Sequence, residues 1–330
     1  MRTFFLLPRR VYSRVTSLLC ALLLACPVAF AQSWPVKPLT LIVPFAPGGG
    51  TDSIARDLAQ LLGAKLGQSV VVDNRGGAGG AIAAEVAAKA RPDGHTLLFV
   101  TSTFITHAAA AKALAYDVLR DFSPIAMLGR GPLLLVANRE LPVRSVADLV
   151  ALARQKAGAL NFCSAGNGSI NHLAGEMFVQ RTGANMTHVP YKGSAPATVD
   201  LLSGQVQVFF ATAPTILGHV RAGRVNLLAV TGARRSRLFA DVPTMAESGI
   251  ANYEVSTWWG VVAPAGTPAA VVNTLNTAIH EAAESDRLRR RFADEGAEGV
   301  RGDPVNFAIH LAAELKSWRA VVAIGNIKLD

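Results

Sequence analysis

Short apolar runs alternate with segments whose apolar residues recur at helical spacing along most of the 330-residue chain. The apolar runs predict buried strands at 39–44, 70–72, 96–100, 133–137, 160–163, 186–190, 206–210 and 225–230. Helical spacing and helix start signals predict helices at 51–62, 81–90, 145–154, 169–181, 194–202 and 215–222, and a last long helix from Asp303-Pro304. This alternation is typical of a mostly parallel α/β sheet, and the length favours two domains.

Loops rich in glycine and hydroxyl residues follow four of the predicted strands, at 45–52, 101–103, 164–169 and 191–194. Ligands of α/β sheets bind outside the carboxyl ends of the strands. In the loop 45–52, glycines leave backbone N–H groups uncovered and a helix start adds partial positive charge, which favours an anion such as a carboxylate. Two of the loops lie in the first third of the chain and two in the middle. We therefore expect a ligand held between two α/β lobes.

Four side chains near these loops allow two interpretations each. Asp52 can orient water or an amine at the bound ligand, or can cap the free N–H groups of its helix. Lys192 can contact an anionic ligand or lie at a solvated rim. His172 can be a ligand contact, although a packing role is favoured, and Cys163 can be a nucleophile, although a small buried residue at a strand end is favoured.

The first 31 residues have the pattern of a cleavable signal peptide. Arg2, Arg9, Arg10 and Arg14 precede an apolar run that is too short for a membrane span, and an A-x-A site ends at Ala31. We therefore expect export to the periplasm. Two alternatives stay open: an uncleaved anchor, and lipid attachment at Cys26, where Pro27 makes a poor match to a lipoprotein site.

Charge and motif content argue against several classes of protein. Removal of the four signal-peptide arginines takes the formal charge from +9 to about +5, without the basic and aromatic clusters of nucleic-acid binders. The chain has no P-loop, complete dinucleotide fingerprint, G-x-S-x-G elbow or H-E-x-x-H motif. Cys163 is alone after the signal peptide and cannot form an internal disulfide. We expect no cofactor, no metal, no catalytic residue and no nucleic-acid partner.

A resemblance to one family runs over nearly the whole exported chain. It rests on Trp34-Pro35-x-Lys37-Pro38, Val43-Pro44-Phe45-Ala46-Pro47-Gly48-Gly49-x-x-Asp52 with Arg56, Val71-Val72-Asp73-Asn74-Arg75-x-Gly77-Ala78-Gly79-Gly80, Pro92-Asp93-Gly94-His95-Thr96-Leu97, Ser164-Ala165-Gly166-x-Gly168-Ser169 with His172-Leu173-Ala174-Gly175-Glu176, Val189-Pro190-Tyr191-Lys192-Gly193 and Asp241-Val242-Pro243-Thr244. With these motifs in this order, the chain resembles the substrate-binding proteins of tripartite tricarboxylate transporters, the Bug-type periplasmic receptors.

The resemblance implies a type II periplasmic-binding-protein fold, with two α/β lobes joined by crossing strands and a ligand cleft between them. We expect lobe I at 32–135 plus 257–330 and lobe II at 136–256. The implied ligand-binding residues are Phe45, Ala46, Pro47, Gly48, Gly49, Thr51, Asp52, Thr101, Ser102, Ser164, Ala165, Gly166, Asn167, Gly168, Ser169, Tyr191, Lys192 and Gly193. Backbone amides and hydroxyls of facing loops would hold a ligand carboxylate, partly through water.

The implied function is that of a receptor, not an enzyme. It would capture a small carboxylated metabolite, and the resemblance implies a di- or tricarboxylate, an acidic amino acid or a nicotinate-like compound. A monomeric receptor would deliver this ligand to a two-component membrane permease or present it to a sensor domain. The alternative is a secreted hydrolase or isomerase with Asp52 or His172 as a base.

Overall fold

From residue 39 to residue 230, strands alternate with helical segments in the computed structural model, which describes residues 34–155, 158–294, 296–325 and 327. The strands of this part are β1 (Leu39–Val43), β2 (Val70–Asn74), β3 (Thr96–Thr101), β4 (Phe122–Asn138), β5 (Leu160–Ser164), β6 (Met186–Pro190), β7 (Val208–Thr212) and β8 (Val225–Val230). The helices are α2 (Gly50–Leu66), the 3₁₀ turn η1 (Ala78–Gly80), α3 (Ala81–Ala88), α4 (Ser102–Ala110), α5 (Val146–Gln155), α6 (Ile170–Thr182), α7 (Ser194–Ser203) and α8 (Ala213–Arg221).

The remaining elements follow a different order: β9 (Ser256–Pro264), α9 (Ala269–Ala283), α10 (Asp286–Asp294), β10 (Glu298–Gly299) and α11 (Pro304–Gly325). Of these, only α11 was predicted, and α4 was not predicted either. All of these elements belong to one of two compact units, Lys37–Asp330. The predicted signal peptide at 1–31 lies outside the described residues. None of the described helices is long and apolar enough to cross a bilayer.

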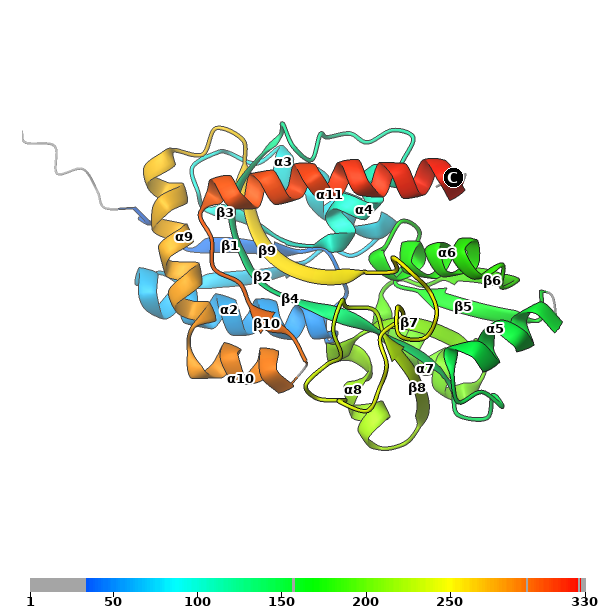
Figure 1. The fold of residues 1–330 in the computed structure, drawn as a ribbon. Helices are drawn as coiled ribbons and strands as arrows, with labels where there is room; N and C mark the ends of the chain where they lie inside the picture. The colour runs from blue at the N-terminus through cyan, green and yellow to red at the C-terminus, as the bar shows by residue number, and fades with distance from the viewer. Residues whose placement is uncertain (1–33, 156–157, 295, 326, 328–330) are drawn as a thin grey trace, which may run out of the picture. The chain divides into compact units, whose positions relative to one another are not determined.

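The sheet is mixed, so the prediction of a mostly parallel sheet is wrong. Its strand order is β2-β1-β3-β9-β4-β7-β5-β6, and β8 and β10 also pair with β4. The sheet contains a first strand group (β1, β2 and β3) and a second strand group (β5, β6 and β7). Within each group the strands pair in parallel. The long strands β4 and β9 join them through antiparallel pairs (Figure 1).

The long strand β4 changes its pairing partners along its length. β4 pairs with β9 from Phe122 to Pro132, and its next residue, Leu133, pairs with Thr212 of β7. Register shifts between Pro124 and Ala126 and between Met127 and Gly129 mark bulges in β4. The strand neighbours of β4 therefore change at Pro132, in the middle of the strand.

Helix caps predicted from the sequence are present. The Asp148 N–H donates to Ser145 Oγ (3.1 Å), while the Asp148 carboxylate accepts from the N–H of Arg144 (2.9 Å). Asp303 accepts from the N–H of Asn306 (2.7 Å) directly before Pro304, the first residue of α11. Both helices therefore begin where side-chain oxygens satisfy their free N–H groups.

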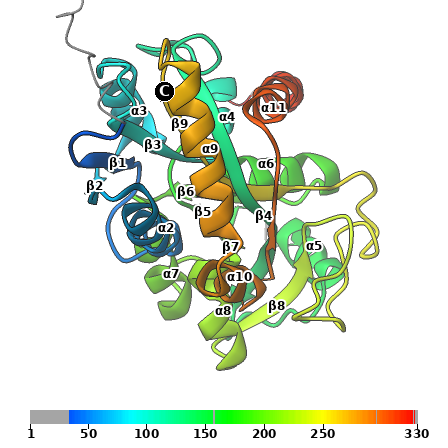
Figure 2. The same cartoon turned by 90° about the vertical axis from the view of Figure 1, so that its left-hand side faces the viewer.

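Helices near the C-terminus pack against earlier helices and against β4. Helix α10 lies beside α2 (Figure 2). The buried carboxylate of Asp57 on α2 joins them by pairing with Arg287 Nη2 and Arg291 Nε of α10, both at 2.5 Å. Helix α11 packs against α4 and β4. From α11, Glu314 Oε2 accepts a hydrogen bond from the buried Trp258 Nε1 of β9 at 2.7 Å.

Glu314 makes the stability of the protein depend on pH. Burial raises its pKa to about 7, although the hydrogen bond from Trp258 acts in the opposite direction. Because this pKa exceeds the unfolded value, the folded state binds an extra proton between about pH 4.5 and 7. The free energy of unfolding therefore falls as pH rises through this interval.

Glu314→Gln is expected to remove this dependence, because a neutral amide still accepts the Trp258 hydrogen bond. At pH 8 the variant should be more stable than the parent by about 3 kcal/mol, and at pH 4.5 the two should differ by less than about 0.5 kcal/mol. Urea unfolding at both pH values measures this difference. The exposed Glu140→Gln is the matched control and should change stability by less than about 0.5 kcal/mol. An equal effect of Glu314→Gln at both pH values would contradict the assignment.

Candidate functional site

A small cavity of about 50 Å³, which we call the socket, lies where strands of both groups end. Nine of the predicted residues line it: Phe45, Ala46, Gly49, Thr51, Asp52, Thr101, Ala165, Lys192 and Gly193. Its other lining residues are Gly50, Thr103, Ile170, Asn171, Ser194, Ala195, Pro196, Thr212, Thr215 and Thr257. The predicted residues outside this lining are Pro47, Gly48, Ser102, Ser164, Gly166, Asn167, Gly168, Ser169 and Tyr191.

The start of α2 forms one wall of the socket. Gly49 is the N-cap, and the first backbone bond of the helix runs from Ser53 N to Gly49 O at 3.0 Å. The N–H groups of Gly50, Thr51 and Asp52 therefore lie outside the helical ladder, as at any helix start. Since Gly50 and Thr51 line the socket, these donors are available to an anion there.

Asp52 holds the glycine loop in place. Its carboxylate is 3% exposed and accepts from Gly48 N (2.9 Å), Arg56 Nε (2.9 Å) and Asn74 Nδ2 (2.8 Å). Asn74 Nδ2 also donates to the carbonyl of Phe45 at 3.0 Å. Burial alone would raise the pKa of Asp52, but the three hydrogen bonds outweigh it and hold the pKa below its usual range. Asp52 is therefore an ionised acceptor for the loop.

The loop 164–169 is held in place mainly by contacts with residues that do not line the socket. Ser164 is fully buried, and its Oγ accepts from Gly166 N (3.1 Å) and lies 2.6 Å from His188 Nε2. The Gly168 carbonyl accepts from Thr106 Oγ1 of α4 at 2.7 Å. Of this loop, only Ala165 lines the socket, followed by Ile170 and Asn171 at the start of α6.

Two stacked histidines pack against the loop 164–169. His172 and His188 stack with ring centroids 3.7 Å apart, and His172 Nδ1 accepts from Gly168 N at 3.1 Å. Burial, and then the neighbouring His172, lowers the pKa of His188 to about 3, so this ring is neutral. These contacts give His172 a packing role, outside the lining of the socket.

Cys163 is fully buried at the end of β5. Burial raises the pKa of its thiol well above the ordinary value, so it stays protonated. Its Sγ contacts the carbonyl of Ala197 at 3.8 Å. This environment suits a packed side chain rather than a nucleophile. Among the residues that the structure describes, no cluster of three or more metal-binding side chains is found.

Residues of the predicted turn 191–193 point in different directions. Lys192 and Gly193 line the socket, and Gly193, at φ +114°, donates its N–H to the Ala165 carbonyl (3.1 Å). Tyr191 instead donates its hydroxyl to Asp200 at 2.7 Å, and burial together with this contact raises its pKa to about 12. The turn therefore contributes backbone and one lysine to the socket.

The starts of five helices converge on the socket. They are α2 (Gly50), α4 (Thr101 and Thr103), α6 (Ile170 and Asn171), α7 (Gly193 and Ser194) and α8 (Thr212 and Thr215). Each helix N-terminus carries about half a positive charge and unpaired N–H groups. These helix starts therefore supply the socket with partial positive charge and with hydroxyl and amide donors.

Several socket residues were missed by the sequence interpretation. Thr212 and Thr215 stand at the end of β7 and the start of α8, the same strand–hydroxyl–helix signal that identified the other loops. Thr257 comes from the unpredicted strand β9, and its Oγ1 accepts from the fully buried Ser102 Oγ at 3.2 Å. Ser102 therefore lies behind the socket wall, joined to a residue that lines it.

Known proteins of one family are similar to this chain over most of its length. The model of the tripartite tricarboxylate transporter family receptor matches residues 54–327. Protein BugT of Bordetella pertussis (strain Tohama I) is 41% identical over 308 residues, which cover 93% of this chain and 94% of that protein. Rpa4515 of R. palustris, solved with adipate, has a TM-score of 0.86 and 39% identity, covering 89% of this chain and 99% of that chain. The periplasmic binding protein BugD has a TM-score of 0.85 and 33% identity, with coverage of 89% and 99%.

These likenesses decide the fold and the class of the protein. The family consists of solute-binding receptors and not of enzymes, so the hydrolase or isomerase alternative is wrong. The two-lobe α/β fold predicted from the resemblance is confirmed. The chain belongs to the tripartite tricarboxylate transporter receptor family of periplasmic solute-binding proteins.

Proposed function

We propose that this receptor captures a small carboxylated metabolite in the socket, between two lobes that close on it. The candidate classes are di- and tricarboxylates, acidic amino acids and nicotinate-like compounds. The signal peptide at 1–31 would place the mature protein in the periplasm. From there, as a monomer, it would deliver the ligand to a two-component membrane permease or to a sensor domain.

The convergence of five helix starts on one cavity carries this proposal. A carboxylate in the socket would receive backbone N–H and hydroxyl donors from α2 on one side and from α6, α7 and α8 on the other. Such fixed donors stabilise an anion without a buried arginine. In agreement, the similar protein Rpa4515 was solved with adipate, a dicarboxylate.

The lobes of the proposal have the boundaries expected from the sequence, 32–135 plus 257–330 and 136–256. The change of strand neighbours within β4, directly after Pro132, supports this division. Lobe closure would be a shift from an open to a closed population that a ligand contacting both lobes favours.

A thermal-shift series with carboxylates tests the function. A ligand at about 100 times its Kd adds about 2.7 kcal/mol to stability, which for a chain of this size raises Tm by about 5 °C. Each acid is paired with its neutral amide, for example adipate with adipamide. We expect only the acids to raise Tm, and the acid recovered afterwards to be chemically unchanged. Equal shifts by the amides, no shift by any carboxylate, or turnover of the ligand would contradict the proposal.

A further inference from the structure

A second, larger cavity of about 590 Å³ adjoins the socket. Gly49, Gly50, Ala195 and Thr215 line both cavities, so the two spaces share a wall. The socket itself has room for a carboxylate and a few waters, but not for the body of a longer metabolite. The rest of a long ligand would therefore extend into a neighbouring space.

Two cavities share lining residues with the socket, and they differ in size. The one beside Phe45 and Thr101 holds only about 10 Å³ and has mostly apolar walls. The larger cavity is a groove open to solvent, and its volume of about 590 Å³ leaves room for the body of a small molecule. A ligand anchored in the socket would therefore extend past Gly50 into the larger cavity.

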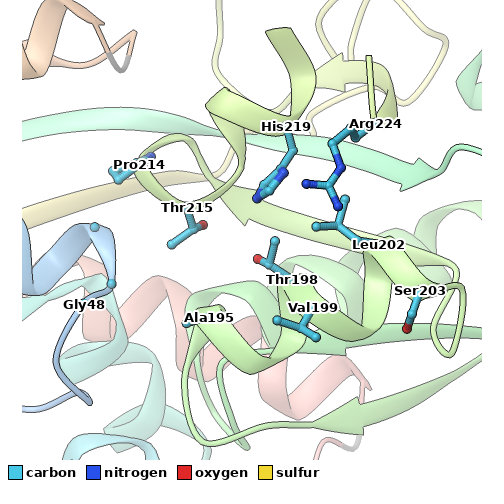
Figure 3. Close-up of a pocket in the computed structure, with 12 residues that line it drawn as sticks. Gly48, Ala195, Thr198, Val199, Leu202, Ser203, Pro214, Thr215, His219 and Arg224 are labelled. Carbon is cyan, nitrogen blue, oxygen red and sulfur yellow. The ribbon is translucent and has the colours of Figure 1, made fainter. Parts of the chain in front are cut away.

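The walls of the larger cavity combine apolar sides with a basic end. Helix α7 contributes Val199 and Leu202, and Pro214 at the start of α8 faces them. Figure 3 shows His219 and Arg224 side by side, both extending from the α8 side of the cavity toward α7. A backbone bond from Arg224 N to His219 O (2.9 Å) holds the two residues together.

Arg224 is exposed at the wall of this cavity, so its guanidinium is accessible to a ligand. No acidic residue lines the cavity, and the Arg224 side chain makes no ion pair or hydrogen bond with the described residues. Arg224 stays charged at all physiological pH values. Burial, and then the charge of Arg224, lowers the pKa of His219, which is therefore neutral near pH 7 and able to hydrogen bond.

We propose that this cavity is a second anionic subsite, in which Arg224 binds the distal carboxylate of an elongated dicarboxylate. The proximal carboxylate occupies the socket, and the polymethylene spacer packs against Val199, Leu202 and Pro214. This inference rests on the proposed function and names its ligand class. A guanidinium suits the second position because it binds a carboxylate through two parallel hydrogen bonds.

Isothermal titration calorimetry of a chain-length series tests the subsite. The probes are the linear α,ω-dicarboxylates from succinate to suberate, together with hexanoate, which has one carboxylate only. We expect the parent protein to prefer a diacid of intermediate length over succinate and over hexanoate. Arg224→Gln should raise the Kd of the preferred diacid at least about 10-fold, since the distal contact is lost. It should change the Kd of hexanoate by less than about 2-fold, because hexanoate has no distal carboxylate.

The matched control is Arg234→Gln, which removes an exposed positive charge outside the cavity. It should leave every Kd within about 2-fold, which separates a specific contact from the general effect of net charge. If Arg224→Gln weakens the binding of hexanoate as much as that of the diacid, or weakens the binding of neither, the proposed subsite is wrong, but the proposed carboxylate binding in the socket is not contradicted. If no carboxylate binds the parent protein, both proposals fail.

Discussion

Replacing Gly50 by valine is expected to weaken carboxylate binding at least about 100-fold, or about 2.7 kcal/mol. A Cβ atom on Gly50 would lie 2.0 Å from Cβ of Pro214 and 3.1 Å from its Cα. Such a contact cannot be relieved by a rotation of a side chain, because proline is held rigidly in its backbone. The start of α2 and the start of α8 would have to move apart, and the donors on the two sides would no longer reach one ligand.

Calorimetry with the tightest carboxylate measures this effect. The Tm of the unliganded variant should stay within about 2 °C of the parent, because segments of different strand groups can separate without unfolding either group. Gly218→Val is the matched control, since a Cβ at this position of α8 meets no atom within 4 Å. Unchanged affinity in Gly50→Val would show that this close approach plays no part in binding.

Asp52→Ala is expected to remove about 3 kcal/mol of stability and to weaken binding by at least about 50-fold. The substitution leaves the Gly48 N–H and the Asn74 amide without their buried acceptor, so the loop that carries the socket donors loses its fixed position. Arg56 loses a partner too, but its side chain is 51% exposed and can be hydrated. Asp52→Asn should fail in the same way, because an amide offers one acceptor oxygen in place of two.

Urea unfolding and calorimetry check both parts of this prediction. Arg56→Gln is the control, since it leaves Gly48 and Asn74 bonded to the carboxylate, and it should cost less than about 1 kcal/mol. The depressed pKa of Asp52 adds a pH test. A carboxylate of this kind contributes stability above its unfolded pKa of about 4, which is lost as pH falls through the lower folded value. Loss of the Asp52 contribution already between pH 7 and 5 would contradict its role as an ionised acceptor.

The sequence pattern predicted most of the strand–helix alternation up to residue 230, but not α4. Of the two strands that join the groups, it predicted only 133–137 in β4 and nothing of β9. In β4, Pro124, Gly129 and Pro132 interrupt the apolar run, so only 133–137 had the pattern of a strand. The bulges beside Pro124 and Gly129 explain how a paired strand tolerates these two residues, and Pro132 stands where β4 changes its pairing partners. β9 is buried along almost all of its length, so it lacks the alternation that marks a half-exposed strand.

The sequence predicted which loops form the site more accurately than it predicted which of their side chains point into the socket. Glycines and hydroxyls at strand ends identified the positions, and nine of the predicted residues line the socket. Ser164 and Tyr191 turn away, to His188 and Asp200, because packing against neighbours chooses their direction. The fold brings Thr257 to the socket and Arg224 to the larger cavity, and local sequence patterns do not specify such placement.

A crystal structure with the tightest-binding dicarboxylate tests the central claim most directly. We predict one carboxylate in the socket, bonded directly or through ordered water to the N–H groups at the start of α2 and to donors at the starts of α6, α7 or α8. The spacer should then run past Gly50, and the second carboxylate should contact Arg224. A ligand bound to one strand group alone, or outside the socket, would contradict the account.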